Sequence, residues 1–463
     1  MRYLSAISAL ALFAATSAQA QTAANLTTLR GLAPFSALLN TDAGKAALAS
    51  NYKVTGAIQT GTSGQPGLQN FPAQQAQALR DAFITIANAT ELADGLGTTL
   101  GDAYQKKATY TEGKDKPSFT AISPSVTQLL AYSIVVTGMD SNSAKYFFAN
   151  ETSQWGKQPP KPVSADAMAI MKSVDGTTDV FGKAYNDPAG RKGADPLGDS
   201  RPYQTERDFA KYADPDYFGQ RSSNSEWLNG SATASPSMGM KLTASPSFPS
   251  GHTTYGYTGA ILLAIMVPQR YSQEVTRAAE YGNSRIVVGA HYAMDVIGGR
   301  TIALYDLAQL LSENPTYLDV NTGKVPPIAD YAAALHLAQG ALVKVLESST
   351  GESIADAAQK DTSRFANPAA NEAFYESTQT YGLPVVFPAE AAKVEDVAKE
   401  APEAGTLLTA AFPYLTLKQA DDILTATEGP GGGFLDNGSH FGLYSRLDLY
   451  KASLQAEAAA PKS

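Results

Sequence analysis

The amino-acid sequence predicts a mainly α-helical protein. The chain has 463 residues, 44% of them hydrophobic, which is enough to bury one large core or two smaller ones. The strict alternation of apolar and polar residues that is typical of strands is scarce, whereas Ala, Leu and Ile recur at helical spacing. We expect helices over 73–104, 125–139, 165–172, 254–267, 272–280, 292–311, 327–347 and 415–427.

The first 20 residues have the pattern of a secretory signal peptide. Arg2 supplies a short positive region, residues 4–15 are largely apolar, and residues 18–20 are Ala-Gln-Ala, a small-residue cleavage site. After this segment no apolar run approaches the roughly 18 residues of a membrane span. We therefore expect a mature protein that begins at Gln21, has no membrane span and is periplasmic or secreted.

The remaining chain divides by composition near Pro315. Residues 21–315 are expected to form a helical catalytic domain, and residues 316–463 a C-terminal extension to which the sequence assigns no role. We expect its end, from Gln455, to lack ordered structure. Between 185 and 247 the chain is rich in Gly, Pro, Asp and Ser, and a loop of that length in a compact domain is usually functional or disordered.

Composition excludes several classes of protein. The formal net charge is −9, which argues against nucleic-acid binding, because that normally needs a basic surface. The chain has no cysteine, so disulfides and Cys-ligated metals are excluded. It also has neither the Gly-x-Ser-x-Gly elbow of serine hydrolases nor the His-Glu-x-x-His pair of zinc proteases. We expect no metal cofactor, and the sequence leaves the oligomeric state open.

Three short segments instead carry residues suited to phosphate chemistry. They are Arg-Pro at 201–202, Pro-Ser-Gly-His at 249–252, and Ser-Arg-x5-His-x3-Asp at 284–295. Arginine offers a planar fork that matches two phosphate oxygens, so Arg201 and Arg285 are candidate phosphate ligands. Backbone N–H groups bind anions where a helix begins, and the second segment precedes a predicted helix.

Two histidines in these segments are candidates for the nucleophile and the general acid of phosphoryl transfer. His291 and Asp295 are four residues apart, which places them on one face of a helix. A carboxylate that accepts from one ring nitrogen fixes the tautomer and leaves the other nitrogen able to attack phosphorus. His252 is then available as the general acid for the leaving oxygen.

The last two segments, in this order, resemble the superfamily that joins bacterial class A acid phosphatases, type 2 phosphatidic acid phosphatases and vanadium haloperoxidases. The resemblance covers about residues 180–300 and implies a helical-bundle catalytic domain. It implies that His291 is the nucleophile, which forms a phosphohistidine, that Asp295 orients it and that His252 is the acid. It also implies a phosphate site that contains Arg201, Ser250, Gly251 and Arg285.

The first part of the family signature, Lys-x6-Arg-Pro, is not fully matched. The family lysine would stand at 194, where this chain has Ala194, and Lys192 lies two residues further away. A loop extension could let Lys192 reach the same oxygen, with Arg191 and Lys183 as alternatives. We therefore include Lys192 among the expected phosphate ligands.

The sequence thus predicts an exported, metal-independent acid phosphatase that acts on small phosphorylated substrates. A vanadium-dependent haloperoxidase is an alternative, because vanadate mimics a phosphate in transit and would be the only cofactor of such an enzyme. A phosphate-binding protein without turnover is a second alternative, although simple binding does not require an oriented nucleophile.

Overall fold

The computed structural model describes residues 21–81, 88–108, 110–111, 118–119, 122–149, 164–185, 199–202, 245–323 and 325–461. These segments form a mainly helical fold, as the sequence predicts. Extended structure in this part of the chain is a two-residue antiparallel pairing of β1 (Tyr110–Thr111) with β2 (Ser118–Phe119). Within the same part, none of the helices is both long and apolar enough to cross a membrane.

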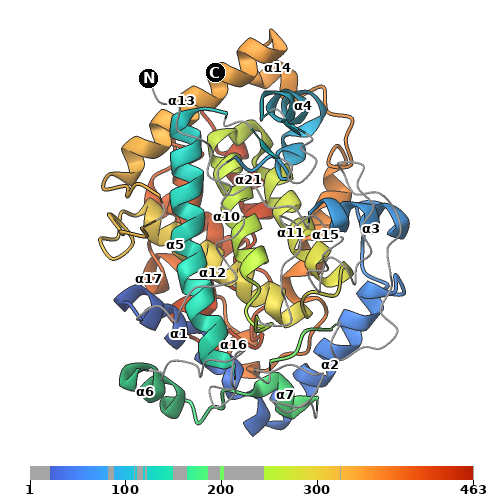
Figure 1. The fold of residues 1–463 in the computed structure, drawn as a ribbon, viewed down its shortest axis with the longest axis vertical. Coiled ribbons are helices and arrows are strands. Elements are labelled where there is room, and N and C mark those ends of the chain that lie inside the picture. Colours follow the sequence, from blue (N-terminus) through green and yellow to red (C-terminus); the bar gives the residue numbers. More distant parts are fainter. Residues whose placement is uncertain are drawn as a thin grey trace.

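The N-terminal elements include one long helix, α5, which runs along much of the molecule (Figure 1). Most of them begin at a Ser, Thr or Asn side chain that accepts from the first turn, the usual N-cap. They are α1 (Ala23–Ser36), η2 (Leu38–Asn40), α2 (Asp42–Gln59), α3 (Phe71–Arg80), η3 (Ala93–Leu96), α4 (Gly97–Ala108), α5 (Pro124–Phe148), α6 (Ala165–Ser173) and α7 (Val180–Ala184).

The expectation of one helical stretch over 73–104 is wrong in detail. Helix α3 ends at Arg80, and the next described helices are η3 and α4. The backbone at Gly97 has φ of +89°, a conformation that glycine adopts without strain, and this residue separates η3 from α4. The interruption turns the carboxylates of Asp81 and Asp94 toward a buried arginine on α11.

Three consecutive helices form the centre of the molecule, where α10 and α12 pack against α5 and α11 packs against α10 and α12 (Figure 1). They confirm the helices expected over 254–267, 272–280 and 292–311. Nearly every residue of α10 and α12 is buried, so both are surrounded by protein rather than amphipathic. The bounds are α10 (Gly251–Met266), η5 (Pro268–Arg270), α11 (Tyr271–Val287) and α12 (Ala293–Leu311).

The C-terminal helices pack around these central helices. The Tyr271 hydroxyl donates to Leu407 O at 2.9 Å, and Arg300 Nη2 donates to Ser445 O at 2.7 Å. The elements are α13 (Tyr331–Thr350), α14 (Ile354–Ala358), α15 (Pro368–Thr380), α16 (Pro388–Ala391), α17 (Val397–Glu400), α18 (Thr406–Thr409), α19 (Leu417–Ala426), α20 (His440–Leu443) and α21 (Leu449–Ala458). The expected loss of order from Gln455 is wrong as far as Ala458, because Ala456 is fully buried and its carbonyl accepts from Tyr414.

Candidate active site

The site is built on the N-terminus of α10. Ser250 caps this helix, since its hydroxyl oxygen accepts from Thr253 N at 3.1 Å. Helix α12 passes so close that a Cβ at Gly299 would lie 2.4 Å from Ser250 O, so only glycine fits there. Gly251 and His252 form the first turn of α10, where backbone N–H groups point out of the helix and favour an anion.

His291 and Asp295 meet at the start of α12. The Nδ1 of His291 lies 3.1 Å from an Asp295 carboxylate oxygen, which also accepts from Tyr292 N at 2.9 Å and from the Ser247 hydroxyl. His291 precedes α12, so the two residues do not share one helical face as the spacing predicts. They meet because the Asp295 side chain folds back over the first turn of the helix. Both side chains are fully buried. Burial raises the pKa of Asp295 to about 6, although the bonds from Ser247 and Tyr292 act the other way.

Arg201 connects this pair to the segment that precedes α10. Its Nη1 lies 3.1 Å from His291 Nε2 and donates to Ala290 O at 2.8 Å. Its remaining nitrogens donate to Ser245 O at 3.0 Å and Pro246 O at 3.0 Å. The arginine N–H can only donate, so His291 Nε2 is an acceptor and its proton is on Nδ1, facing the carboxylate.

The turn between α11 and α12 explains the Arg-x5-His spacing. Gly289 has φ of +71°, and the chain folds back so that Ala290 N and His291 N both donate to Arg285 O, at 3.0 and 3.2 Å. Arg285 is fully buried on α11. The ring of His252 faces the same place from α10, with its centroid 6.3 Å from that of His291.

The buried cations shift both histidines toward the neutral form. Burial, followed by the charges of Arg201, Lys145 and Arg285, holds the pKa of His291 well below its usual range. Burial and then Arg285, Arg201 and Lys145 lower the pKa of His252 in the same way. Two neutral imidazoles therefore face each other beside three buried cations, and a bound dianion would raise the pKa of both.

The structure brings together the seven described residues among the eight that the sequence predicts for the site. Lys192 falls outside the described residues, as do the alternative Arg191 and position 194. Lys183, the other alternative, is exposed on α7 and donates to the Thr177 hydroxyl. The residues that meet are Arg201, Ser250, Gly251, His252, Arg285, His291 and Asp295.

A lysine that the sequence motifs do not include lies in the same place. Lys145 of α5 is 5% exposed, and its charge contributes to the low pKa of both histidines. No local spacing identifies it, because it comes from a helix that lies far from the motifs in sequence. The one signal is that the lysine stands between Ala144 and the apolar residues Phe147 and Phe148, and a lysine buried in such surroundings is rare unless it has a partner.

An ion-pair network on α11 adjoins the site. Arg277 pairs with Asp81 and with Asp94, the latter at 2.7 Å, and Arg364 from the C-terminal region pairs with Asp94 at 2.7 Å. Ser284 donates to Asp81 at 2.7 Å. The network thus ties the residue next to Arg285 to α3 and to the C-terminal region.

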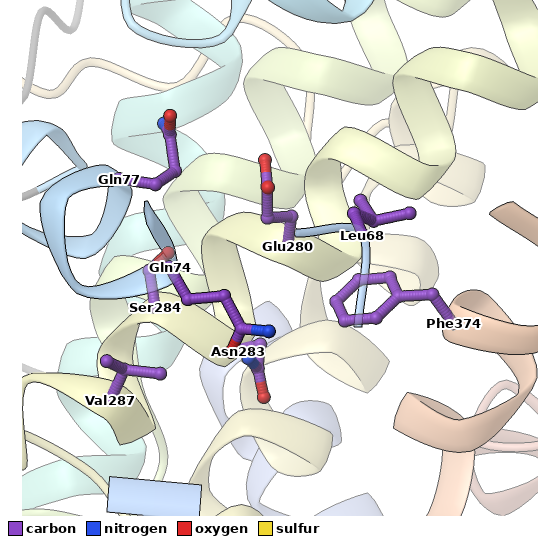
Figure 2. A pocket seen from close by; sticks show the side chains of 8 residues that line it. All are labelled: Leu68, Gln74, Gln77, Glu280, Asn283, Ser284, Val287 and Phe374. Atoms are coloured by element: carbon purple, nitrogen blue, oxygen red, sulfur yellow. The ribbon is translucent and has the colours of Figure 1, made fainter. Parts of the chain in front are cut away.

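A small recess opens beyond this network, between α3, α11 and α15 (Figure 2). Its volume of about 10 Å³ is room for one water molecule. Neither histidine lines it, so it is not the place where the chemistry occurs. Its lining residues are Leu68, Gln74, Gln77, Glu280, Asn283, Ser284, Val287 and Phe374.

The convergent groups place an imidazole that contacts a carboxylate beside the buried cations Arg201, Arg285 and Lys145. Comparison with known sequences gives the family of this part of the chain. Residues 195–309 match the PAP2 superfamily, and this segment of the chain is a PAP2 superfamily domain. The matched residues contain all the convergent groups named above except Lys145, and they begin after Lys192.

Curated relatives of this segment are acid phosphatases. The non-specific acid phosphatase of Salmonella typhimurium is 37% identical over 79 residues, which are 17% of this chain and 32% of that protein. The acid phosphatase of Zymomonas mobilis is 42% identical over 64 residues, 14% of this chain and 24% of that protein. The non-specific acid phosphatase of Providencia stuartii is 36% identical over 77 residues, 17% and 31% of the two chains. The chain spans about a quarter to a third of the length of these relatives.

Proposed function

We propose that the chain hydrolyses phosphate monoesters and that His291 carries the phosphoryl group between the two half-reactions. The observation that supports this most strongly is the 3.1 Å contact of His291 Nδ1 with Asp295. It leaves the Nε2 lone pair directed toward the cationic side of the pocket, where a phosphate would bind. A protein that only binds phosphate needs no such orientation, and the acid phosphatase names of the relatives favour turnover.

The reaction divides between the two histidines. In the first step the Nε2 lone pair of His291 forms a bond to phosphorus while the P–O bond to the alcohol breaks, and His252 gives its proton to the departing oxygen. In the second step water gives a proton to His252 and attacks phosphorus, the N–P bond breaks and inorganic phosphate leaves. Asp295 stabilises the charge that His291 acquires on attack.

The phosphoryl oxygens are bound by groups that are in place before the substrate arrives. Arg201 and Arg285 supply two cationic forks, and the Ser250 hydroxyl with the Gly251 N–H supplies neutral donors at the positive end of α10. An entering phosphate takes over the Arg201 N–H that faces His291 Nε2 at 3.1 Å, which frees that nitrogen to attack. The assignment does not depend on Lys192.

We propose that no metal ion takes part, because the two arginines and the helix N-terminus supply the positive charge that phosphoryl transfer requires. Activity should then survive a chelator such as EDTA. Orthovanadate should inhibit, because it occupies the phosphate site as a five-coordinate mimic of the transition state. Loss of activity in chelator that a divalent cation restores would contradict this part of the proposal.

The test of function is a substrate panel on the purified mature chain. The panel contains p-nitrophenyl phosphate, alkyl phosphates, nucleotides and phosphatidate, with bromide and peroxide as a separate arm with and without vanadate. We expect release of inorganic phosphate from small monoesters and a radiolabelled phosphohistidine after alkaline quench. Halide oxidation that requires vanadate, without phosphate release, would show the haloperoxidase instead, and phosphate binding without either activity would show a binding protein.

We also propose that the chain is exported. The support is the signal-peptide pattern of residues 1–20, which lie outside the described residues. Expression of the whole chain in a bacterial host should give a periplasmic or secreted product whose first residue is Gln21. A full-length product that remains in the cytoplasm would contradict the proposal.

A further inference from the structure

Lys145 is buried beside the residues proposed to bind phosphate. It belongs to the last turn of α5 and is 5% exposed. Its ammonium donates to Pro246 O at 2.7 Å and to Ser247 O at 3.4 Å, two carbonyls that directly precede the Pro-Ser-Gly-His segment. An ammonium has three N–H donors, so two bonds to carbonyls leave one donor and the whole positive charge. Within the described residues it forms no ion pair.

The Lys145 side chain extends toward the first residue of α10. A Cβ built on Gly251 would lie 3.3 Å from Lys145 Cε and 3.4 Å from Ser141 Oγ. Ser141 and Lys145 are one helical turn apart on α5, so both polar groups reach the first residue of α10 from the same side. A substituent at Gly251 would fill the space that they share.

Ser141 gives a second, independent indication of a ligand. The residue is fully buried, and in the described part of the chain its hydroxyl has no hydrogen-bond partner. A buried hydroxyl without a partner loses the hydrogen bonds that it made to water, which is unfavourable unless a ligand replaces them. A phosphate oxygen at the N-terminus of α10 would accept from it.

The charge of Lys145 acts on the reacting groups. It lowers the pKa of both His252 and His291 and opposes the rise in the pKa of Asp295. Burial and then the charge of Arg201 lower the pKa of Lys145 well below its usual range, while Asp199 and Asp295 act in the opposite direction. A dianion bound here would restore the charged form.

We propose that Lys145, with the Ser141 hydroxyl beside it, binds the phosphoryl group of the substrate. This assignment rests on the proposed function and deepens it, because it supplies a lysine where the Arg-Pro segment has Ala194 at the expected position. The ammonium comes from α5 rather than from the loop before Arg201. It would neutralise the phosphoryl oxygen that faces α5, while Arg201 and Arg285 take the others.

The first experiment measures the binding of inorganic phosphate by calorimetry to the full mature chain and to Lys145→Gln. Glutamine keeps N–H donors for the two carbonyls but removes the charge, so a purely structural role would be largely preserved. We expect phosphate affinity to fall about tenfold to a hundredfold, the size of one charge-assisted hydrogen bond. Lys172→Gln, on the exposed face of α6, is the matched control and should bind as the wild type does. Lys192→Gln is measured in parallel.

The outcomes separate this assignment from the proposed function. Wild type and Lys145→Gln with equal affinities, or a larger loss in Lys192→Gln than in Lys145→Gln, would overturn the role of Lys145. A wild type that binds phosphate but hydrolyses no ester would overturn the proposed function and leave the Lys145 measurement valid. A wild type that does not bind phosphate would overturn both.

A measurement on the wild type guards against a variant that fails to fold. Trace acetylation of the native protein with acetic anhydride, read by peptide mass spectrometry, gives the relative reactivity of each lysine. Phosphate should slow acetylation of Lys145 at least about fivefold relative to Lys172, because a bound anion stabilises the unreactive charged ammonium and blocks access. Equal rates with and without phosphate would overturn the proposal.

Discussion

Two clusters of cations adjoin Arg285, an outer one around Arg277 and an inner one around Lys145 and Arg201, and they differ in what they face. In the outer cluster Arg277 contacts the carboxylates of Asp81 and Asp94. In the inner one Lys145 contacts two backbone carbonyls, and Arg201 contacts carbonyls and the His291 ring. In the first cluster the arginine pairs with carboxylates. In the second, Lys145 and Arg201 are positive charges that both act on His291.

The pKa directions express the same difference. Burial lowers the pKa of Arg277, yet the carboxylates of Asp81, Asp94 and Glu280 outweigh it and raise that pKa well above its usual range. For Lys145 burial is dominant and the pKa falls. A buried arginine whose carboxylates are supplied by the protein serves the fold, whereas Lys145, which forms no ion pair within the described residues, is suited to an anionic ligand. Substitutions in the inner cluster should therefore affect activity, and those in the outer cluster stability.

The largest expected effect is on turnover. His291→Ala should lower kcat for p-nitrophenyl phosphate by about 10⁴–10⁶-fold, because removal of a nucleophile disables the whole pathway. No phosphohistidine should be trapped after alkaline quench. His336→Ala, at an exposed position of α13, is the control and should act as the wild type does. If His291→Ala also lowered the unfolding midpoint as much as changes in the outer cluster do, the division between the two clusters would fail.

A smaller and more selective effect is expected from the second histidine. His252 only protonates the leaving oxygen, so His252→Ala should slow hydrolysis of alkyl phosphates by about 10²–10⁴-fold. p-Nitrophenolate leaves without help, so its ester should be affected much less. The measurement is kcat/KM against leaving-group pKa for the wild type and the variant. A uniform loss across the series would show that His252 acts in binding rather than as an acid.

In the outer cluster the expected effect is on stability. Asp81→Ala removes a fully buried partner of Arg277 and should lower the free energy of unfolding by about 3–5 kcal/mol in urea denaturation. Arg285 donates to the backbone carbonyl of Asp81, a contact that alanine keeps, so phosphate affinity of the folded variant should change little. The control is Asp422→Ala, which removes an exposed pair with Lys418 and should have little effect on stability.

The comparison also explains how much could be read from the sequence. The central helices were predictable because they are rich in Ala, Leu and Ile. The group of Arg285, His291 and Asp295 was predictable because a single turn that contains Gly289 connects its members. What depends on contacts distant in sequence was not predictable. Lys145 reaches the site from another helix, and the break between α3 and η3 places Asp81 and Asp94 against an arginine nearly 200 residues away. Helical periodicity carries no information on either.

A third buried cluster contains acids without a cation among the described residues. Asp140 of α5 and Asp306 of α12 share a hydrogen bond, and the Tyr317 hydroxyl lies 3.2 Å from both. Burial raises the pKa of Asp140 to about 6, although hydrogen bonds from Thr28 and Asn25 lower it. Burial and the charge of Asp140 raise the pKa of Asp306 well above its usual range. The folded protein therefore keeps protons here that the unfolded chain has lost.

The smallest expected effect follows from the sign of this shift. A raised acid pKa means that stability is greatest below the unfolded value of about 4 and falls as pH rises through the folded values. Asp306→Asn keeps an N–H donor for Asp140 without a second charge, so it should raise the free energy of unfolding at pH 8 by on the order of 1 kcal/mol. The gain should vanish near pH 4, and Asp166→Asn, on an exposed part of α6, should show neither change. Thermal unfolding from pH 4 to pH 8 measures the stability of both variants. If Asp306→Asn were less stable than the wild type at pH 8, the proton shared by the two carboxyls would stabilise the fold more than the amide does.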